Sequence, residues 1–234
     1  MTLLGQVLPN QKVCSQVATE KQPGPPRPSH RYLLQSCTGG RCRSPPGKIK
    51  IAALRMYTCC VERINYDEFF DKCFLPDTLN SWFLIAQLHV WMCLVRMRQE
   101  GREGKFMCRY IVHSMWEDVE QRSKIMGVSR VWKEAMKAMT ETFYAAIFGY
   151  DEGILSDDCV LAAALWRNLF NCQCDDPQQL ELMVEYVRKQ MQFIDSLDGE
   201  DLLLTGEVKW RPLVEENAQS ILKVVSPTYN DTGL

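Results

Sequence analysis

The histidines are the residues of this sequence with the greatest potential for acid–base or metal chemistry. His113 and Glu117 are four positions apart, so on a helix both side chains lie on one face and could share a metal ion or a hydrogen bond. A di-metal carboxylate site needs Glu-x-x-His on two helices, but Ala86 precedes His89 by three positions and Tyr110 precedes His113. We therefore expect His113 and Glu117 to be an ordinary surface or core pair.

His89 lies in a strongly apolar stretch, residues 82–95, where Gln87 is the only other polar residue. A buried imidazole without a partner costs about 1–3 kcal/mol, so we predict a buried structural hydrogen bond for His89. A helix needs about 20 apolar residues to cross a bilayer, and this stretch is too short. It predicts a central helix covered by others; the alternative is a helix that lies against a membrane or receives an apolar client.

The eleven cysteines are scattered along the chain. Cys59–Cys60 and Cys172–Cys174 are close pairs, but neither has a second pair at the spacing of zinc ligands. Cysteines on apolar helix stretches, such as Cys60, Cys93 and Cys108, act as small hydrophobic residues. An odd number of such thiols is typical of a reducing compartment.

Motifs of the common catalytic classes are absent from the sequence. It contains no His-Glu-x-x-His, no Gly-x-Ser-x-Gly, no Gly-x-Gly-x-x-Gly and no phosphate-binding loop. We therefore predict no catalytic, cofactor-binding or metal-ligating residues.

Five cations surround Gly101: Arg96, Arg98, Arg102, Lys105 and Arg109. Cations stabilise the C-terminal end of a helix, so a solvated, capped turn is one interpretation. The other is a binding patch for an anionic partner such as ribosomal RNA or phospholipid.

From Lys48 onward, apolar residues recur at helical spacing, and no alternating strand pattern with a hairpin signal is found. Helices are expected from Lys48, from an Asp77 N-cap to Gly101, from Glu103 to Gly127, from a Ser129 cap, from Ser156 or Asp157, and from Asp176–Pro177. The pattern predicts an all-α fold: one compact multi-helix domain with a disordered N-terminal leader and an irregular C-terminal tail.

The expected domain boundaries follow the composition. Residues 1–47 carry six basic residues, one acid and seven of the eleven prolines, which leaves a charge of −7 for the rest of the chain. We interpret 1–47 as a basic, proline-rich flexible leader, 48–205 as the helical domain and 206–234 as a C-terminal extension. The leader matches a mitochondrial transit peptide only in part.

Several ordered blocks resemble the ubiquinol-cytochrome c chaperone family. They are residues 75–85, 88–92, 95–98, 143–144, 149–152, 158–168 and 203–208. The resemblance runs from Lys48 to the C-terminus and implies a non-enzymatic mitochondrial chaperone for respiratory complex III assembly. It further implies that newly synthesised cytochrome b, a small complex III assembly-factor subunit and the mitochondrial ribosome are partners, on the matrix side of the inner membrane, with peripheral membrane association.

Partner-binding residues are expected on the apolar helix and the basic turn. An apolar helix beside a basic turn could offer one surface to a hydrophobic client and another to ribosomal RNA. The candidates are Trp82, Trp91, Arg96, Arg98 and Arg109.

Residues 1–47 do not resemble the leader of that family, so the chain is expected to be an alternative N-terminal form joined to a shortened domain. A cytosolic or vesicle-associated adaptor that uses the proline-rich leader as a polyproline ligand is an alternative function. A helical-bundle enzyme with a bound metal or cofactor is a further one.

Overall fold

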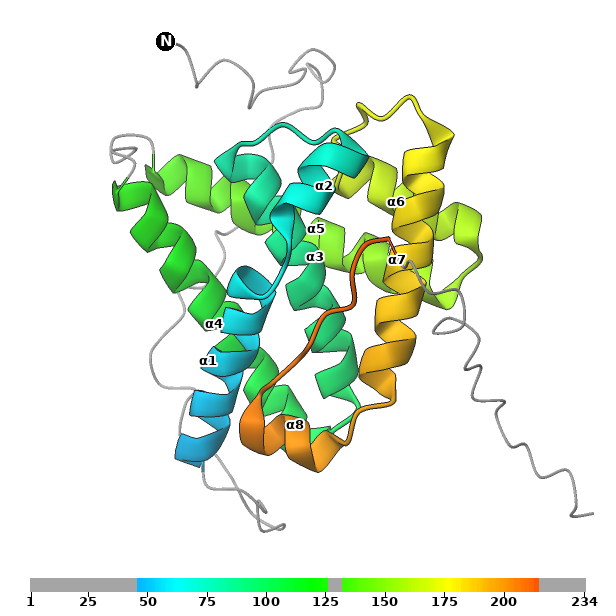
Figure 1. Ribbon diagram of the computed structural model, residues 1–234. Coiled ribbons are helices and arrows are strands. Elements are labelled where there is room, and N and C mark those ends of the chain that lie inside the picture. The colour runs from blue at the N-terminus through cyan, green and yellow to red at the C-terminus, as the bar shows by residue number, and fades with distance from the viewer. Residues whose placement is uncertain (1–45, 126–131, 215–234) are drawn as a thin grey trace, which may run out of the picture. The chain divides into compact units, whose positions relative to one another are not determined.

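Eight helices and no strand make up the part of the chain that the computed structural model describes, residues 46–125 and 132–214 (Figure 1). They are α1 (Pro46–Glu62), α2 (Tyr66–Cys73), α3 (Leu79–Arg98), α4 (Gly101–Ile125), α5 (Trp132–Leu155), α6 (Asp158–Asn168), α7 (Pro177–Asp195) and α8 (Gly199–Thr205). The predicted all-α fold is confirmed. The expected leader, the Gly127 stop, the Ser129 cap and residues 215–234 lie outside the described residues.

Side-chain caps fix where several helices begin. Asp157, one of the two expected candidates, accepts a hydrogen bond from the Val160 N–H at 3.0 Å. Asp176 accepts one from the Gln178 N–H at 2.9 Å, as predicted. The predicted Asp77 cap of α3 is wrong by one residue. Thr78 has the extended backbone of an N-cap, and its hydroxyl accepts from the Ser81 N–H at 3.2 Å.

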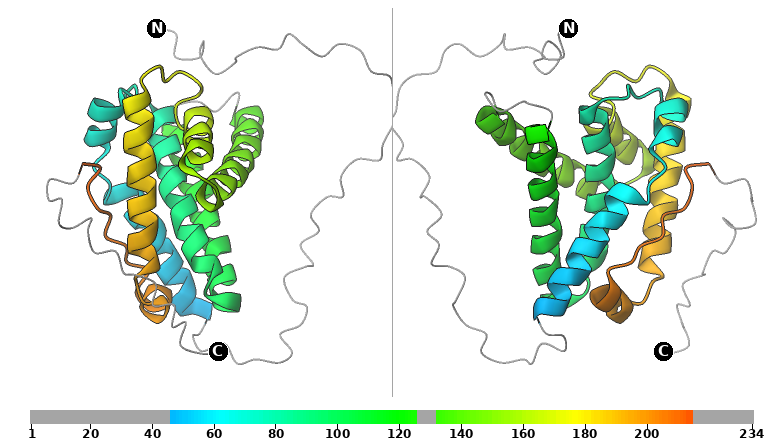
Figure 2. Two further views of the ribbon diagram at one scale, coloured as in Figure 1. Left: turned by 90° about the vertical axis from the view of Figure 1, so that its right-hand side faces the viewer. Right: turned by 60° about the vertical axis from the view of Figure 1, so that its left-hand side comes forward.

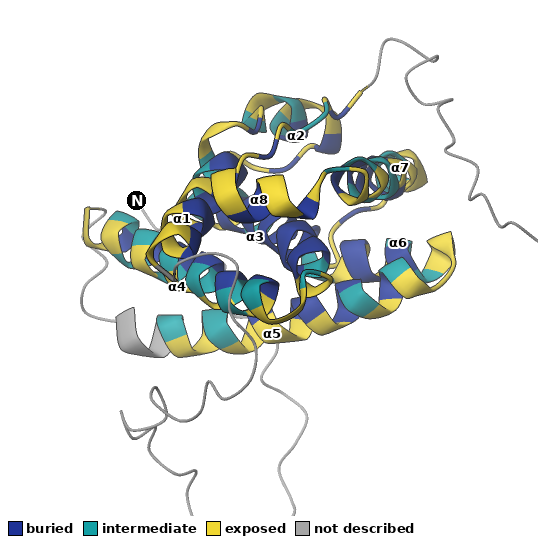
Figure 3. Ribbon diagram, turned by 90° about the horizontal axis from the view of Figure 1, so that it is seen from below, coloured by how far each residue is buried: buried dark blue, intermediate teal, exposed yellow. Residues whose placement is uncertain are grey.

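α3 is the central helix, with its middle turns buried on every side (Figure 3). α1, α4, α5 and α7 all pack against it, and Figure 2 shows α1 beside α4 while α5 and α6 form a separate hairpin. The prediction of a central helix covered by its neighbours is therefore confirmed. Within the described residues, no helix combines the length and apolarity that crossing a bilayer demands.

Two short helices, α2 and α8, were not expected from the sequence. α8 ends at Gly206, which has φ of 67° and lies against the Ala52 carbonyl, where a Cβ atom would come within 1.9 Å of the oxygen. Only glycine allows this approach. It directs residues 206–214, here called the C-terminal strap, back over the helices.

The C-terminal strap, the first part of the expected C-terminal extension, is packed onto the helices. Val208 and Leu213 are buried, and the Trp210 indole N–H donates to the Cys59 carbonyl at 2.9 Å. The Gln190 side chain donates to the Arg211 carbonyl at 2.7 Å. These contacts join the strap to α1 and α7.

The predicted hydrogen bond of His89 is confirmed and joins α3 to α7. Nδ1 lies 2.8 Å from the Ile85 carbonyl oxygen and Nε2 lies 2.7 Å from the Tyr186 hydroxyl. Because a carbonyl can only accept, Nδ1 carries the proton and Nε2 accepts from Tyr186. The rings of Phe69 and Trp210 meet the imidazole edge-on, at centroid distances of 5.8 and 4.5 Å. Burial lowers the pKa of His89 to about 4.

The buried cysteines pack as small hydrophobic residues, as predicted. Cys60 and Cys93 meet in the core between α1 and α3, with their sulfur atoms 3.6 Å apart. Burial raises the pKa of the Cys60 thiol, so it stays protonated. Cys108 is half-buried, and its thiol donates to the Leu94 carbonyl at 3.7 Å.

The depressed pKa of His89 predicts a stability that depends on pH. The folded-state pKa of about 4 lies below the ordinary histidine pKa of 6.5, so as pH falls the unfolded chain takes up this proton first. The free energy of unfolding should therefore decrease between pH 6.5 and pH 4, with a ceiling of about 3 kcal/mol from this group. Urea unfolding of the wild type and His89→Gln at several pH values measures the effect. Curves that stay parallel over this interval would contradict it.

Candidate functional site

The outward face of α5 carries a row of large apolar side chains. Tyr144, Phe148 and Leu155 are 59%, 75% and 87% exposed, and their spacing of four and seven residues places them on one face. The opposite face of α5 is buried through Phe143 and Tyr150. We call Tyr144, Phe148 and Leu155 the α5 row; no element of the described chain covers it.

A groove lies between α5 and α6, next to the α5 row. It has a volume of about 340 Å³ and is lined by Gly149, Glu152, Asp157, Cys159, Val160, Ala163, Ala164 and Arg167. Small residues allow the two helices to approach closely: a Cβ atom on Gly153 would lie 2.8 Å from Leu161 Cα. The lining combines small apolar residues with a few charges, and it includes members of two blocks that carry the family resemblance, 149–152 and 158–168.

Asp151 connects the central helix to α5. Trp91 is buried against the Tyr150 ring at a centroid distance of 5.1 Å, and its indole N–H donates to Asp151 Oδ1 at 2.8 Å. Arg98 donates to Asp151 Oδ2, also at 2.8 Å. One carboxylate therefore fixes α5 to both the middle and the C-terminal end of α3.

Arg96 points into the protein, away from the basic turn. Its guanidinium donates to the carbonyl oxygens of Ile194 at 3.2 Å and Leu197 at 2.9 Å, and it forms an ion pair with Glu100. These carbonyls belong to the end of α7, where a cation is favoured by the helix dipole. Arg96 therefore holds the end of α7 against α3.

The exposed part of the turn is formed by the start of α4. Gly101 has φ of 62°, which lets α4 begin directly after α3. Arg102, Lys105 and Arg109 are exposed, and none forms an ion pair with a carboxylate in the described residues. This group of cations is available to an anionic partner.

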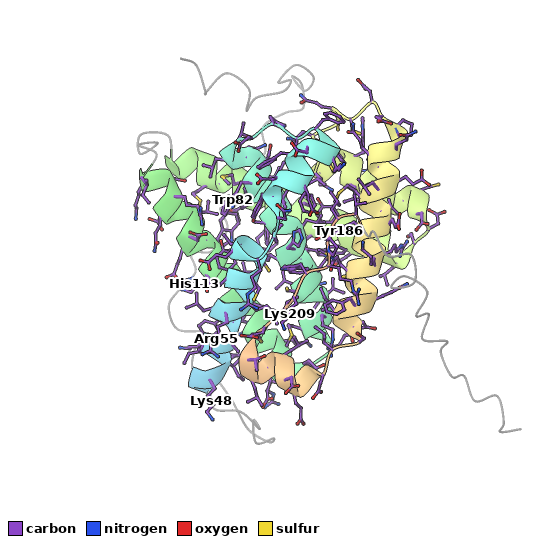
Figure 4. All side chains as sticks on the ribbon, in the orientation of Figure 1. Lys48, Arg55, Trp82, His113, Tyr186 and Lys209 are labelled. Atoms are coloured by element: carbon purple, nitrogen blue, oxygen red, sulfur yellow. The ribbon has the colours of Figure 1, made fainter. Side chains whose placement is uncertain are left out.

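The five predicted partner-binding residues do not form one surface. Arg98 and Arg109 are exposed near the turn, while Trp91 and Arg96 are buried and can affect a partner only by positioning other residues. Trp82 is half-buried near the start of α3, where the Arg122 guanidinium stacks over its ring at 4.3 Å (Figure 4).

Sequence reasoning missed the α5 row and the groove beside it. The available signal was a helix with apolar residues on both faces, because Phe143, Ala146 and Ile147 already supply a buried stripe. Tyr144 and Phe148 then fall on the opposite side.

The imidazole of His113 and the carboxylate of Glu117 are 3.4 Å apart and exposed, in keeping with an ordinary surface pair (Figure 4). Among the described residues, no three potential metal ligands gather.

The burial of Arg96 predicts a large loss of stability on its removal. Arg96→Ala leaves the Leu197 carbonyl and the Glu100 carboxylate without this donor, while the Ile194 carbonyl keeps the Leu197 N–H, and we expect the free energy of unfolding to fall by about 3 kcal/mol. Arg109→Ala removes the same side chain from an exposed position and should change it by less than about 0.5 kcal/mol. Denaturant unfolding of both variants provides the comparison; equal losses would show that Arg96 has no special structural role.

The amino-acid sequence of this chain is similar to those of several known proteins. The family model described as ubiquinol-cytochrome C chaperone matches residues 71–210. The ubiquinol-cytochrome-c reductase complex assembly factor 1 of Xenopus laevis is 80% identical over 188 residues, covering 80% of this chain and 94% of that protein. The Homo sapiens protein of that name is 71% identical over 188 residues, covering 80% of this chain and 63% of that protein.

A more distant sequence relative and a solved structure also match this chain. The mitochondrial protein CBP3 of Saccharomyces cerevisiae is 30% identical over 177 residues, covering 69% of this chain and 52% of that protein. The crystal structure of the Cbp3 homolog from Brucella abortus has a TM-score of 0.62 at 22% identity, covering 71% of this chain and 92% of that one, which supports the fold. This chain spans less than two thirds of the human relative. On the match over residues 71–210 and the identity to these relatives, the chain belongs to the ubiquinol-cytochrome c chaperone family.

Proposed function

We propose that this chain is an assembly chaperone for mitochondrial respiratory complex III that holds newly synthesised cytochrome b on the α5 row and the α5–α6 groove. The observation that carries the proposal is an uncovered row of large apolar residues on a domain of this family. The relatives named for assembly of the ubiquinol-cytochrome c reductase complex support the choice of client.

The geometry of the α5 row suits an apolar helical segment. Tyr144 and Leu155 are eleven residues apart, so the row extends about 16 Å along the helix axis, about three turns of a bound helix. Amphipathic or apolar helices dock into grooves through side chains at such intervals. The small residues Gly149 and Ala163 let a helix backbone come close.

The remaining partners belong to other surfaces. We place the mitochondrial ribosome at the exposed cations of the turn, through Arg98 and Arg109, and include Trp82 among the residues for the small complex III assembly-factor subunit. The proposed location is the matrix side of the inner membrane, with peripheral membrane association. The yeast relative named as mitochondrial supports the organelle.

Replacing the α5 row should weaken client capture. The test is a triple variant, Tyr144→Ser, Phe148→Ser, Leu155→Ser. Each lost apolar contact costs roughly 1 kcal/mol, so recovery of cytochrome b should fall at least about tenfold. Co-purification of radiolabelled cytochrome b from detergent-solubilised mitochondria after a translation pulse measures this. Ile125→Ser, Leu204→Ser is the matched control, because it removes exposed apolar residues from α4 and α8 and should leave capture intact. Undiminished capture by the α5 variant would place the client elsewhere.

Charge reversal at the turn should weaken ribosome association without unfolding the domain. Arg98→Glu, Arg109→Glu changes only exposed cations, whereas the buried Arg96 is left in place. We expect a several-fold loss of co-sedimentation with mitochondrial ribosomes at low salt, and the difference from the wild type should shrink as salt is added because the contact is electrostatic. Thermal unfolding checks that Arg98→Glu, which breaks the ion pair with Asp151, still folds. Unchanged co-sedimentation would remove the turn from the ribosome contact.

A further inference from the structure

The outward face of α1 combines exposed aliphatic residues with cations. Ile51 and Leu54 are 55% and 54% exposed, and Lys48, Lys50 and Arg55 are exposed around them. The first acidic residue of α1 is Glu62, its last residue, about 16 Å along the axis from Ile51. The face is therefore basic and apolar over the first ten residues of the helix.

The rest of the structure holds this face in a fixed orientation. The opposite side of α1 is fully buried through Ala52, Met56 and Cys60. Lys50 lies 4.8 Å from the Tyr110 ring centroid on α4, and further along the Tyr57 hydroxyl donates to Asp118 at 2.7 Å. α1 and α4 thus run parallel, and the outward face of α1 stays uncovered by the described chain.

The cations of this face have no carboxylate partners among the described residues. No ion pair joins Lys48, Lys50 or Arg55 to a described carboxylate, whereas Arg63, beyond the end of α1, pairs with Glu207 at 3.7 Å. Lys209 of the C-terminal strap adds a cation on the same side of the molecule, where Figure 4 labels it with Lys48 and Arg55. The positive charge is thus available to an anionic surface.

We propose that the outward face of α1 binds the surface of a bilayer that contains anionic phospholipid. The cations are complementary to lipid phosphates, and Ile51 and Leu54 can enter the boundary between headgroups and acyl chains, which stabilises such contacts. Single-stranded RNA favours aromatic residues for stacking, and this face presents aliphatic ones. The proposal refines the peripheral membrane association included in the proposed function; it does not depend on the client.

Vesicle flotation of the full chain tests the proposal. The probes are vesicles of phosphatidylcholine alone and of phosphatidylcholine with phosphatidylglycerol. The wild type should float with the anionic vesicles only, and added salt should weaken the binding. A triple variant, Lys48→Gln, Lys50→Gln, Arg55→Gln, should lower the affinity for anionic vesicles roughly 100-fold. Ile51→Ser, Leu54→Ser should lower it roughly tenfold with little change in salt dependence.

A charge-matched control separates this face from general basicity. The control is the triple variant Arg102→Gln, Lys105→Gln, Arg109→Gln, which removes the same charge from α4. It should lower the affinity for anionic vesicles only a few-fold. Circular dichroism and thermal unfolding confirm that each variant folds. Equal losses in both triple variants, or no binding to anionic vesicles, would overturn the proposal.

Binding of a ribosomal RNA fragment that is lost with the α1 variants, without vesicle binding, would overturn the proposal in favour of a nucleic-acid contact. Cytochrome b capture by the α1 variants, measured in detergent, distinguishes failure of this proposal from failure of the proposed function.

Discussion

The fold depends on the need to cover α3 from every direction. A helix that is apolar all round gains stability only when other helices remove its whole surface from water. α1, α4, α5 and α7 meet this need by packing on different sides. The polar residues of α3 then fix how the cover fits: His89 pairs with Tyr186, Trp91 with Asp151, and Arg96 with the end of α7. A shift of α5 or α7 would leave one of these groups buried without its partner.

Much of this arrangement follows from local sequence patterns. The central position of α3, the role of His89 and the Asp176 cap depend on periodicity and on side-chain chemistry within one turn, so the sequence predicts them. The predicted end of α3 at Gly101 is wrong by three residues, because α3 ends at Arg98 and Gly101 begins α4. The cap of α3 differs by one residue because Asp77 and Thr78 both suit the position, and backbone geometry decides between them. The predicted family is confirmed.

The parts that could not be predicted depend on contacts between distant residues. α8 is only seven residues long, and its end is set by Gly206 against Ala52, a contact that no local pattern contains. Trp91 and Arg96 were expected at a partner surface because they lie on an apolar helix that leads into a basic turn. Burial instead follows from what faces them: Tyr150 and Asp151 for Trp91, and the carbonyls at the end of α7 for Arg96. The sequence does not show which apolar face of α5 is buried, and the α5 row is the face that stays exposed.

Covering α3 also determines where partners can bind, because each covering helix turns its other face outward. The α5 row, the α1 face and the exposed cations of α4 lie on separate helices, so one partner need not displace another. Asp151 is the physical link between two of these regions, since it accepts from Arg98 with one oxygen and from Trp91 with the other. A partner that draws Arg98 away would leave Asp151 with Trp91 alone and loosen the hold of α3 on α5. The surface proposed for the client and the turn proposed for the ribosome are therefore connected through a single carboxylate, while α1 is anchored independently through Tyr57 and Asp118.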